Sequence, residues 1–505
     1  MTRRWLFADQ LGPHFLDDPA DDLAGHGDDH GRPVLLIESR AVFARRRWHR
    51  QKAHLVLSAL RHRAAELGER AEFVQARTYR EGLDRAGGRA AGPLTVCQPT
   101  SWAADAFVRS LEGVEVLPAR GFATDRDTFE RWAAGQRGLL MENFYRDARR
   151  RLDLLMDGGD PAGGRWNLDA ENREPPPKGA ARLGVPPPWR PEEDDIDARV
   201  REDLDRWERD GDVSFVGRDG PRRFAATRTE ALEALETFIE GRLAAFGPHE
   251  DAMLAGDPTM AHSLLSAPMN LGLLDPLECA RAAEEAYRAG RAPLASVEGY
   301  IRQLVGWRDY IWHVYWHAGT GYRRRNALAA GGGLPRWFAE LDADAVEARC
   351  LSGVLGQVRD HGWVHHIPRL MILSNYALQR GWDPAAVTDW FHRCFVDGYD
   401  WVMVPNVVGM SQHADGGLMA TKPYASGGAY ISRMSDYCPG CRYRPSRRTG
   451  PDACPFTAGY WTFLDRNRER LAHNHRMARP LAGLDRLDDL DEVVAGERDR
   501  GGSPP

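Results

Sequence analysis

The sequence predicts an N-terminal α/β domain with a doubly wound parallel sheet, followed by an all-α C-terminal domain. Over roughly the first 130 residues, short apolar runs that end at polar residues alternate with helical patterns. From about Thr227 to Leu484, apolar residues recur at three- and four-residue spacing. A chain of 505 residues is also too long for one hydrophobic core. We expect an α/β domain over 1–130, a linker over 131–226, a helical domain over 227–484 and a flexible tail over 485–505.

The elements of the first domain follow from its apolar runs. The stretch from Trp48 to about Leu67 has an apolar stripe at helical spacing. Strands are predicted at Trp5–Ala8, Val34–Glu38, Glu72–Val74, Leu94–Val96 and Val114–Leu117. The turn after the first strand, Asp9 to Gly12, contains no G-x-G-x-x-G, so we expect no ordinary nicotinamide dinucleotide site. A ligand of such a sheet lies beyond the carboxyl ends of its strands.

Composition and charge narrow the setting and the partners. No apolar run is long enough to span a bilayer, and the first residues lack the pattern of a secretory signal. We therefore expect a cytoplasmic protein that does not bind membranes. A net charge of −6 argues against indiscriminate coating of nucleic acid, although a local basic patch is enough for phosphate contacts.

A cysteine pattern near the C-terminal end indicates a metal site. Cys438 and Cys441 form a C-x-x-C pair, and Cys454 with a following proline comes after twelve more residues. Cys350 is the best fourth ligand, because the remaining cysteines lie in the other domain or in apolar helical contexts. Cysteine followed by proline is typical of the last ligand of an iron–sulfur cluster, whereas four cysteines also suit structural zinc. Spacing alone leaves cluster and zinc about equal.

Polar and aromatic residues of the helical part are candidates for a flat, phosphate-bearing ligand. Ser263 and Ser266 lie in a turn between helical stretches, where hydroxyls and amides suit a pyrophosphate but also serve as ordinary caps. Trp307 and Arg308 lie together on a helix, a pairing that suits stacking on a ligand as well as core packing. The run from Asp397 to Gly417 is rich in glycine and polar residues, which predicts a loop around a heterocycle or a solvated connection.

Two adjacent histidines are candidates for acid chemistry. His365 and His366 precede Pro368 and Arg369 at the predicted start of a helix, where proline is tolerated. The helix dipole disfavours the charged form of a histidine in this position, so we expect easy proton exchange. A single histidine would more often be structural, and the pair beside Arg369 favours a catalytic role.

Several segments carry a resemblance to one family. They are Asp9–Leu11, the Gly164–Arg173 stretch of the Gly- and Pro-rich linker, His365–Ile372, and the long run from Asn406 through Tyr424 to Tyr443. Over nearly the whole chain the sequence resembles the photolyase/cryptochrome superfamily, and within it the prokaryotic iron–sulfur branch often called photolyase-related proteins. The resemblance implies the photolyase/cryptochrome fold and favours a [4Fe-4S] cluster over zinc.

This resemblance implies a light-driven enzyme that reverses (6-4) photoproducts in UV-damaged DNA. FAD would lie in the helical domain, a 6,7-dimethyl-8-ribityllumazine antenna near the first domain, and the damaged base would be flipped out of the duplex. The implied roles are catalytic for His365, His366 and Tyr424; FAD-binding for Ser263, Leu264, Ser266, Trp307, Arg308, Arg369, Trp390, Asp397, Asp400 and Asn406; antenna-binding for Asp9, Gln10 and Glu38; DNA-binding for Arg165, Trp166, Asn172, Arg173, Lys178 and Lys422; and cluster-binding for Cys350, Cys438, Cys441 and Cys454.

Two positions depart from the family pattern. Relatives usually read Trp-Phe-Trp before the first cluster cysteine, whereas this chain has Trp337, Phe338 and Ala339. The third position is an expected member of the electron relay to the flavin, and Trp390 remains in its matching place. Pro368 replaces a residue that is commonly polar.

Two other functions compete with repair. A blue-light photoreceptor of the cryptochrome type would share the fold and cofactors, and the altered relay leaves this role open. A zinc-containing, non-catalytic DNA-binding protein is the second alternative, and it would be colourless. We expect a monomer in each case.

Overall fold

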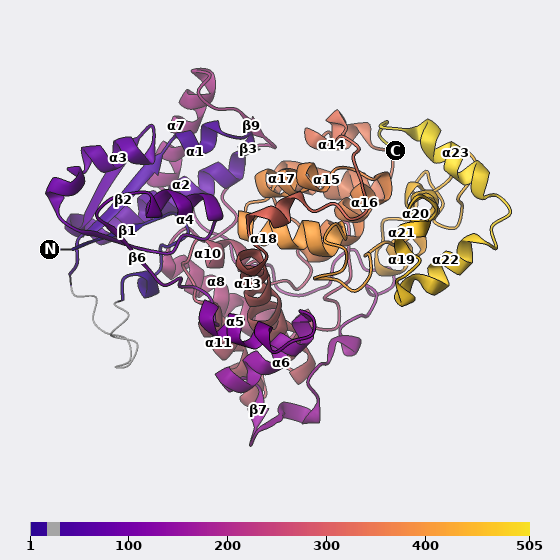
Figure 1. The fold of residues 1–505 in the computed structure, drawn as a ribbon, viewed down its shortest axis with the longest axis horizontal. Coiled ribbons are helices and arrows are strands. Elements are labelled where there is room, and N and C mark those ends of the chain that lie inside the picture. The colour runs from indigo at the N-terminus through magenta and orange to yellow at the C-terminus, as the bar shows by residue number, and fades with distance from the viewer. Residues whose placement is uncertain (1, 18–30) are drawn as a thin grey trace.

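The computed structural model describes residues 2–17 and 31–505 and contains the two predicted domains side by side (Figure 1). A five-stranded parallel sheet at the N-terminal side has the strand order β4-β2-β1-β5-β6. The strands are β1 Arg3–Leu6, β2 Val34–Ser39, β4 Ala71–Ala76, β5 Leu94–Cys97 and β6 Val114–Leu117. The predicted doubly wound parallel sheet and largely helical C-terminal part are therefore confirmed.

Helices cover both faces of this sheet, which explains why its central strands β1, β2 and β5 are buried along their whole length. α2 (Arg50–Leu67) packs against β2 and β4, where Leu36 belongs to the same core cluster as Leu55. On the other face lie α3 (Tyr79–Arg85) and α4 (Trp102–Arg109), where Trp5 and Leu35 pack with Val108. A strand buried on both faces has no polar side to alternate with.

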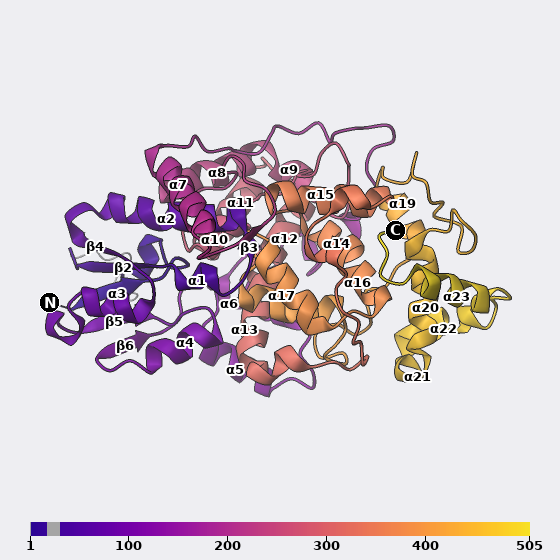
Figure 2. The ribbon, with the colours of Figure 1, turned by 90° about the horizontal axis from the view of Figure 1, so that it is seen from above.

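The helical part forms the centre and the opposite side of the molecule (Figures 1 and 2). Its helices are α8 Arg228–Gly241, α9 Leu243–Phe246, α10 Ser266–Asn270, α11 Pro276–Arg288, α12 Leu294–Ile301, α13 Asp309–Ala318, α14 Arg336–Ala339, α15 Arg349–His361, α16 Asn375–Arg380, α17 Pro384–Cys394, α18 Asp400–Val404, α19 Gly428–Met434, α20 Pro455–Arg466, α21 Arg468–Leu471 and α22 Ala478–Leu484. The C-terminal helices, from α19 to α23 (Leu490–Arg500), lie at the end of the molecule opposite the sheet (Figure 1).

Three seven-residue π-helical segments interrupt this part: η7 Arg302–Arg308, η10 Pro368–Ser374 and η11 Pro405–Ser411. Each contains at least one residue predicted to bind FAD. π-helical turns are rare and occur frequently at functional sites. The run from Asp400 to Ser411, which we expected to be loop-rich, is therefore helical, formed by α18 and η11.

The segment over 131–226 is more structured than a linker. It contains the end of α5 (Arg126–Ala134), α6 (Met141–Leu152) and α7 (Asp195–Arg209). α6 packs on η7 of the helical part, whereas α7 packs back on α2 of the first domain. The segment also contains two short strand pairings. β7 (Met156–Asp157) pairs with β8 (Asp160–Pro161), and β9 (Phe215–Val216) pairs with β3 (Trp48–His49) of the first domain.

The 485–505 segment also differs from the flexible tail that we expected. It contains α23 (Leu490–Arg500), which packs on α20. The Pro505 carbonyl accepts hydrogen bonds from the backbone N–H groups of Glu347 and Ala348, at 2.7 and 2.9 Å. The helix α23 has a partly apolar sequence, and Val493 on it is buried. Separately, no helix of the described residues is long and apolar enough to cross a membrane.

Candidate functional site

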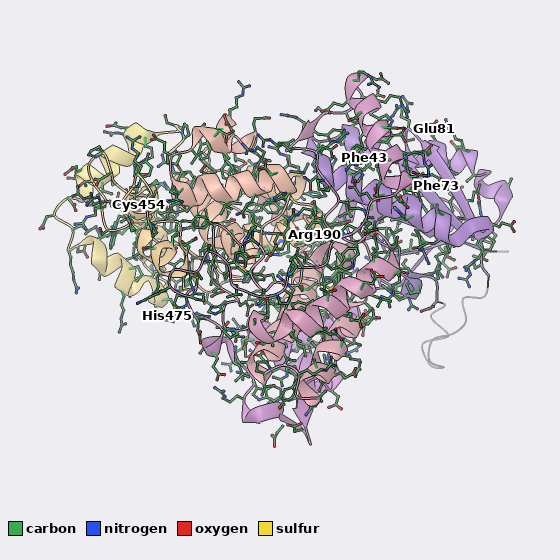
Figure 3. All side chains as sticks on the ribbon, turned by 180° about the vertical axis from the view of Figure 1, so that it is seen from behind. Phe43, Phe73, Glu81, Arg190, Cys454 and His475 are labelled. Atoms are coloured by element: carbon green, nitrogen blue, oxygen red, sulfur yellow. The ribbon has the colours of Figure 1, made fainter. Side chains whose placement is uncertain are left out.

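All four predicted metal ligands line one cavity at the end of the molecule that carries α20, where Cys454 is labelled in Figure 3. The cavity has a volume of about 320 Å³, and the rings of Tyr437, Tyr443 and Phe456 contribute to its walls. Its cysteines come from separate elements and form no disulfide. Cys350 lies in the first turn of α15, Cys454 caps α20, and Cys438 and Cys441 follow α19.

Local backbone geometry brings these thiols together. The Cys441 N–H donates to the Cys438 carbonyl at 3.1 Å, which folds the C-x-x-C segment into a tight turn. Gly440 in this turn has a φ of +75°, a conformation that strongly favours glycine. At the start of α19, a Cβ on Gly428 would lie 2.8 Å from the Cys454 Sγ, so the glycine keeps this side of the cavity open.

The burial of the thiols around this cavity suits a metal group. Burial raises the pKa of Cys350 well above the ordinary value, and the neighbouring cysteines add to the effect. Burial likewise raises the pKa of Cys438 to about 11. Several thiolates in one apolar cavity require a cation that balances their charge, and thiolate ligands favour zinc or iron–sulfur groups.

A second set of predicted residues meets at Asp397. Arg369 donates to both carboxylate oxygens of Asp397, at 2.9 and 3.0 Å, and the Ser266 hydroxyl donates to it at 2.7 Å. Asn270, which the sequence did not single out, donates to the Asp397 carbonyl at 3.0 Å. This network joins η10 to α10 and to the loop between α17 and α18. The Asp397 side chain at its centre is buried.

Beside Ser263 and Leu264 lies a cavity of about 240 Å³. Leu264 has a φ of +60°, a strained conformation for a non-glycine residue that is found most often at functional sites. Arg223 lines the same cavity together with Trp189, and burial lowers the pKa of the arginine. A neighbouring cation, Arg190 (labelled in Figure 3), donates to the Arg223 carbonyl at 3.4 Å. A cavity with an arginine suits a pyrophosphate. The apolar, Pro-rich surroundings of Trp189 and Arg223 gave no periodic signal in the sequence.

Other residues predicted to bind FAD lie in separate contacts. Arg308 donates to the Gly121 carbonyl at 2.8 Å and stacks over Trp401, so it joins the two domains. Trp307 is only partly buried on η7. Asp400 accepts a hydrogen bond from Tyr315 at 2.8 Å and forms an ion pair with Arg323. The Asn406 amide donates to the Val402 carbonyl at 2.8 Å, and the indole of Trp390 donates to the Phe338 carbonyl at 3.0 Å.

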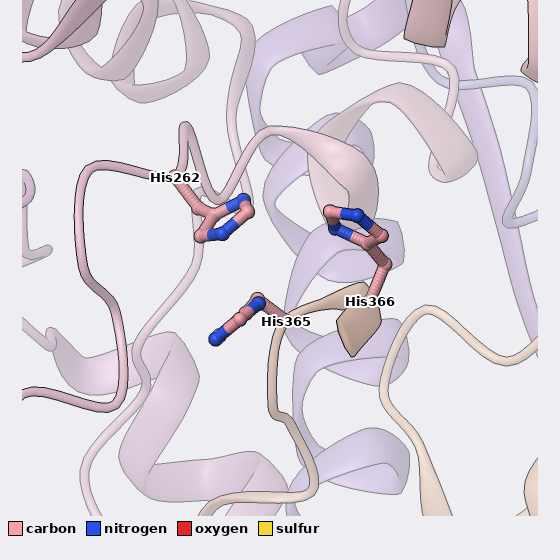
Figure 4. A group of neighbouring side chains, drawn as sticks. All are labelled: His262, His365 and His366. Atoms are coloured by element: carbon pink, nitrogen blue, oxygen red, sulfur yellow. The ribbon is translucent and has the colours of Figure 1, made fainter. Parts of the chain in front are cut away.

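The predicted catalytic histidines lie beside a third histidine, His262 (Figure 4). The rings of His262 and His365 are stacked with centroids 4.2 Å apart and planes inclined by 20°. Burial lowers the pKa of both rings well below the ordinary value. Two stacked imidazoles direct their nitrogen lone pairs within nearly parallel planes, so the pair does not converge on one metal ion.

His366 is the exposed member of this group, at the start of a helix as predicted. Its side chain is 44% exposed, and its Nε2 lies 3.7 Å from a carboxylate oxygen of Asp251. Tyr424 lies partly buried, with Arg173, Asp169 and Asp251 as its nearest charged groups. An exposed histidine with a carboxylate neighbour can hold a proton and release it to a ligand at the surface.

The residues predicted to contact DNA divide into two groups. Arg165, Arg173, Lys178 and Lys422 are exposed, and Trp166 lies under Arg150 at 4.5 Å. Asn172 instead is 2% exposed, and its amide donates to the Ala295 carbonyl at 3.0 Å. This position corrects the expectation for Asn172, since a buried side chain that anchors the loop to α12 cannot reach a duplex in this conformation.

The residues predicted to bind the antenna lie at two strand ends. Asp9 and Gln10 follow β1, next to β5, where the strand order of the sheet reverses direction. Asp9 accepts a hydrogen bond from Thr100 at 2.5 Å, and burial raises its pKa. The Gln10 amide donates to the Cys97 carbonyl at 2.9 Å. Glu38 is buried and accepts two hydrogen bonds from Arg61, each of 2.8 Å.

Comparison with known proteins assigns the chain to a family. A curated protein of Agrobacterium fabrum named "(6-4) photolyase" is 42% identical over 477 residues, covering 90% of this chain and 91% of the relative. The family described as "Deoxyribodipyrimidine photo-lyase-related protein" matches residues 4–212. The chain belongs to the photolyase-related family.

Further matches support the fold of this photolyase-related protein. An uncharacterized protein of Acanthamoeba polyphaga mimivirus is 44% identical over 66 residues, covering 13% of this chain and 54% of the viral protein. The crystal structure of a bacterial class III photolyase from Agrobacterium tumefaciens superposes with a TM-score of 0.54 and 17% identity, covering 86% of each chain. The latter similarity supports the fold, and family membership implies a flavin cofactor and DNA as substrate.

Proposed function

We propose that this protein is a light-driven DNA photolyase that reverses (6-4) photoproducts. The observation that carries this proposal is the exposed His366, placed beside a stacked and uncharged histidine pair and next to Asp251. The relative named "(6-4) photolyase" supports the lesion class. His366 would donate a proton to the hydroxyl of the flipped-out lesion, which makes that hydroxyl a better leaving group.

FAD would lie between the Arg223 cavity and the Asp397 network. Arg223, Ser263 and the strained Leu264 turn suit its pyrophosphate, and the Arg369–Asp397 pair offers both a donor and an acceptor to its ring. When bound and reduced, the flavin supplies the light-excited electron donor. The protein side chains around it would exclude water and fix the distance to the lesion.

The four-cysteine cavity would hold a [4Fe-4S] cluster. Four cysteines around one cavity with aromatic walls would suit either a cluster or a zinc ion, and the resemblance to the iron–sulfur branch of the family favours the cluster. A 6,7-dimethyl-8-ribityllumazine antenna would bind near the carboxyl ends of β1 and β5, where Asp9 and Gln10 lie and where ligands of such sheets commonly bind. Arg165, Arg173, Lys178 and Lys422 would contact DNA phosphates. We further propose a monomer in the cytoplasm.

A repair assay tests the function directly. Duplex DNA with a single (6-4) photoproduct is incubated with the purified protein under blue light and in the dark, and the intact base pairs are quantified. We expect repair only in the light, with little repair of a cyclobutane dimer in a parallel reaction. Absence of light-dependent repair would contradict the proposal and favour a photoreceptor. A colourless preparation that contains zinc would contradict both.

A further inference from the structure

Glu250 is a buried acid next in sequence to the carboxylate that faces the exposed histidine. It is 4% exposed, and it precedes Asp251, the residue that lies 3.7 Å from His366. An acid buried to this degree is unusual unless a partner or a function retains it. Neither the sequence pattern nor the proposed reaction accounts for Glu250.

The surroundings of Glu250 are built for a carboxyl group. The Gln303 amide on η7 donates to its Oε1 at 2.6 Å. On α12, a Cβ at Gly299 would lie 3.2 Å from Oε2, so the glycine makes room for the acid. The Asn172 amide lies 2.6 Å from the same Cβ position, which places the anchored loop beside Glu250 as well.

Charged groups face Glu250 from each element packed against it. After burial, the charge of His366 has the largest effect on the pKa of Glu250, which it lowers. Arg302 on η7 also lowers this pKa, whereas Asp251 on the same segment and Asp169 on the loop raise it. Arg302 also forms ion pairs with Asp169, at 2.8 Å, and with Glu298, at 3.6 Å. Burial dominates and raises the pKa of Glu250 to about 7, so the acid changes charge in the neutral range.

We propose that Glu250 is a positioning residue that controls how firmly His366 holds the proton used in repair. This inference rests on the proposed function. At low pH the Glu250 carboxyl is neutral and adds no charge behind the histidine. When it ionises, its negative charge favours the charged form of His366, which keeps the proton available at higher pH.

The pH profile of repair in a Glu250→Gln variant tests this role, because glutamine imitates the neutral acid at every pH. We expect the alkaline limb of the repair rate to move down by roughly half a pH unit, the size of a charge interaction that solvent partly screens. Glu250→Asp should restore most of the wild-type profile. Glu236→Gln, an exposed substitution on α8, is the matched control and should not move the limb.

Thermal unfolding between pH 4.5 and 8 provides a reading that does not need activity. Because the pKa of Glu250 is raised in the folded protein, its contribution to stability is present below about pH 4.5 and is lost as pH rises through about 7. The glutamine variant lacks this loss, so its unfolding temperature should rise relative to wild type over that range.

The possible outcomes separate this inference from the function on which it rests. No repair by the wild type would overturn the proposed function and this role with it. Repair with an unchanged alkaline limb in Glu250→Gln would overturn the role of Glu250 alone. Parallel unfolding curves for wild type and variant would show that Glu250 does not titrate near neutrality, and this would also overturn the inference.

Discussion

Two groups of potential metal ligands lie in the helical domain, and their geometry differs. The four cysteines, from Cys350 to Cys454, surround a cavity of about 320 Å³ that Gly428 keeps open. The three histidines instead pack on one another, with the rings of His262 and His365 stacked at 4.2 Å. The cysteines therefore leave space for a group that the chain does not itself supply, whereas the histidines fill their own space.

This difference indicates different chemistry for residues that are all good ligands. Buried thiols with raised pKa values need a cation before they can ionise together. Buried imidazoles with lowered pKa values are stable as neutral rings and can direct the proton on an exposed neighbour. Substitutions in the first group should thus affect metal content and folding, and those in the second should affect the reaction rate.

The largest effect is expected for Cys454→Ser, because it removes a proposed cluster ligand at the start of α20. Iron content should fall from about four atoms per chain to less than one, and most of the protein should become insoluble, since metal binding and folding are coupled. Iron analysis and the yield of soluble protein measure both changes. Cys394→Ala, at a buried thiol on α17 outside the cavity, is the control. Full iron content in Cys454→Ser would exclude this residue as a ligand.

The second effect is expected for His366→Ala, which should slow light-driven repair by about two orders of magnitude. Iron content and the unfolding temperature should stay close to wild type, because this side chain is 44% exposed. Single-turnover repair of (6-4) DNA gives the rate. His317→Ala, an exposed histidine on α13, serves as the comparison. A wild-type rate for His366→Ala would remove the histidine from the reaction.

Much of the fold could be predicted because its signals are local or periodic. The strands around Trp5 and Leu35 are buried on both faces, so continuous apolar runs identified them. The grouping of the four cysteines could be predicted because a C-x-x-C pair constrains chemistry before any fold is known; that they bind a metal stays a prediction. The prediction failed for Asp400–Ser411, where glycine and polar residues indicated a loop. Tertiary packing of Val407 and Val408 there favours a π-helix over local propensity.

The parts of the site that could not be predicted depend on contacts between distant segments. Glu250 and Asp251 lie in a non-periodic stretch, and only the fold brings them to His366. Asn172 lies in a polar, glycine-rich sequence typical of exposed loops, yet its amide is buried against α12. Arg223 and Trp189 line one cavity although helix α7 lies between them in the sequence. Neither composition nor spacing carries information on such pairings.

A smaller effect is expected for Gly428→Ala, which tests whether the cysteine cavity must stay open. The added methyl would lie 2.8 Å from the Cys454 Sγ and 3.1 Å from the Pro445 Cα, so the loop around Pro445 must move. We expect iron content to fall severalfold and the unfolding temperature by several degrees. Gly496→Ala on α23, where a Cβ meets nothing within 4 Å, is the matched control. Unchanged iron content would show that the cavity tolerates the methyl.

A chain of aromatic rings connects the surroundings of Asp397 with the cysteine cavity. Arg369, which binds Asp397, lies over Phe395 at 4.4 Å, and Phe395 is 5.9 Å from Trp390. From Trp390 the chain continues through Phe338 at 4.4 Å and Trp382 at a further 4.7 Å. Tyr376 then links Trp382 to Phe456 in the cavity wall, with 5.6 Å for each step. The surroundings of Asp397 and the cysteine cavity are therefore connected by a continuous series of aromatic contacts.

The smallest expected effect concerns Ala339, which follows Phe338 on α14 and replaces an aromatic residue of the family pattern. Its partly exposed position leaves room for a larger side chain at the surface. We expect Ala339→Trp to accelerate photoreduction of the bound flavin a fewfold, because a third ring would shorten the path from Trp390 to solvent. Absorbance under blue light with a thiol reductant measures the rate. Trp390→Phe should slow it in both backgrounds. If Ala339→Trp has no effect while Trp390→Phe does, position 339 lies outside the path by which electrons reach Trp390 in this chain.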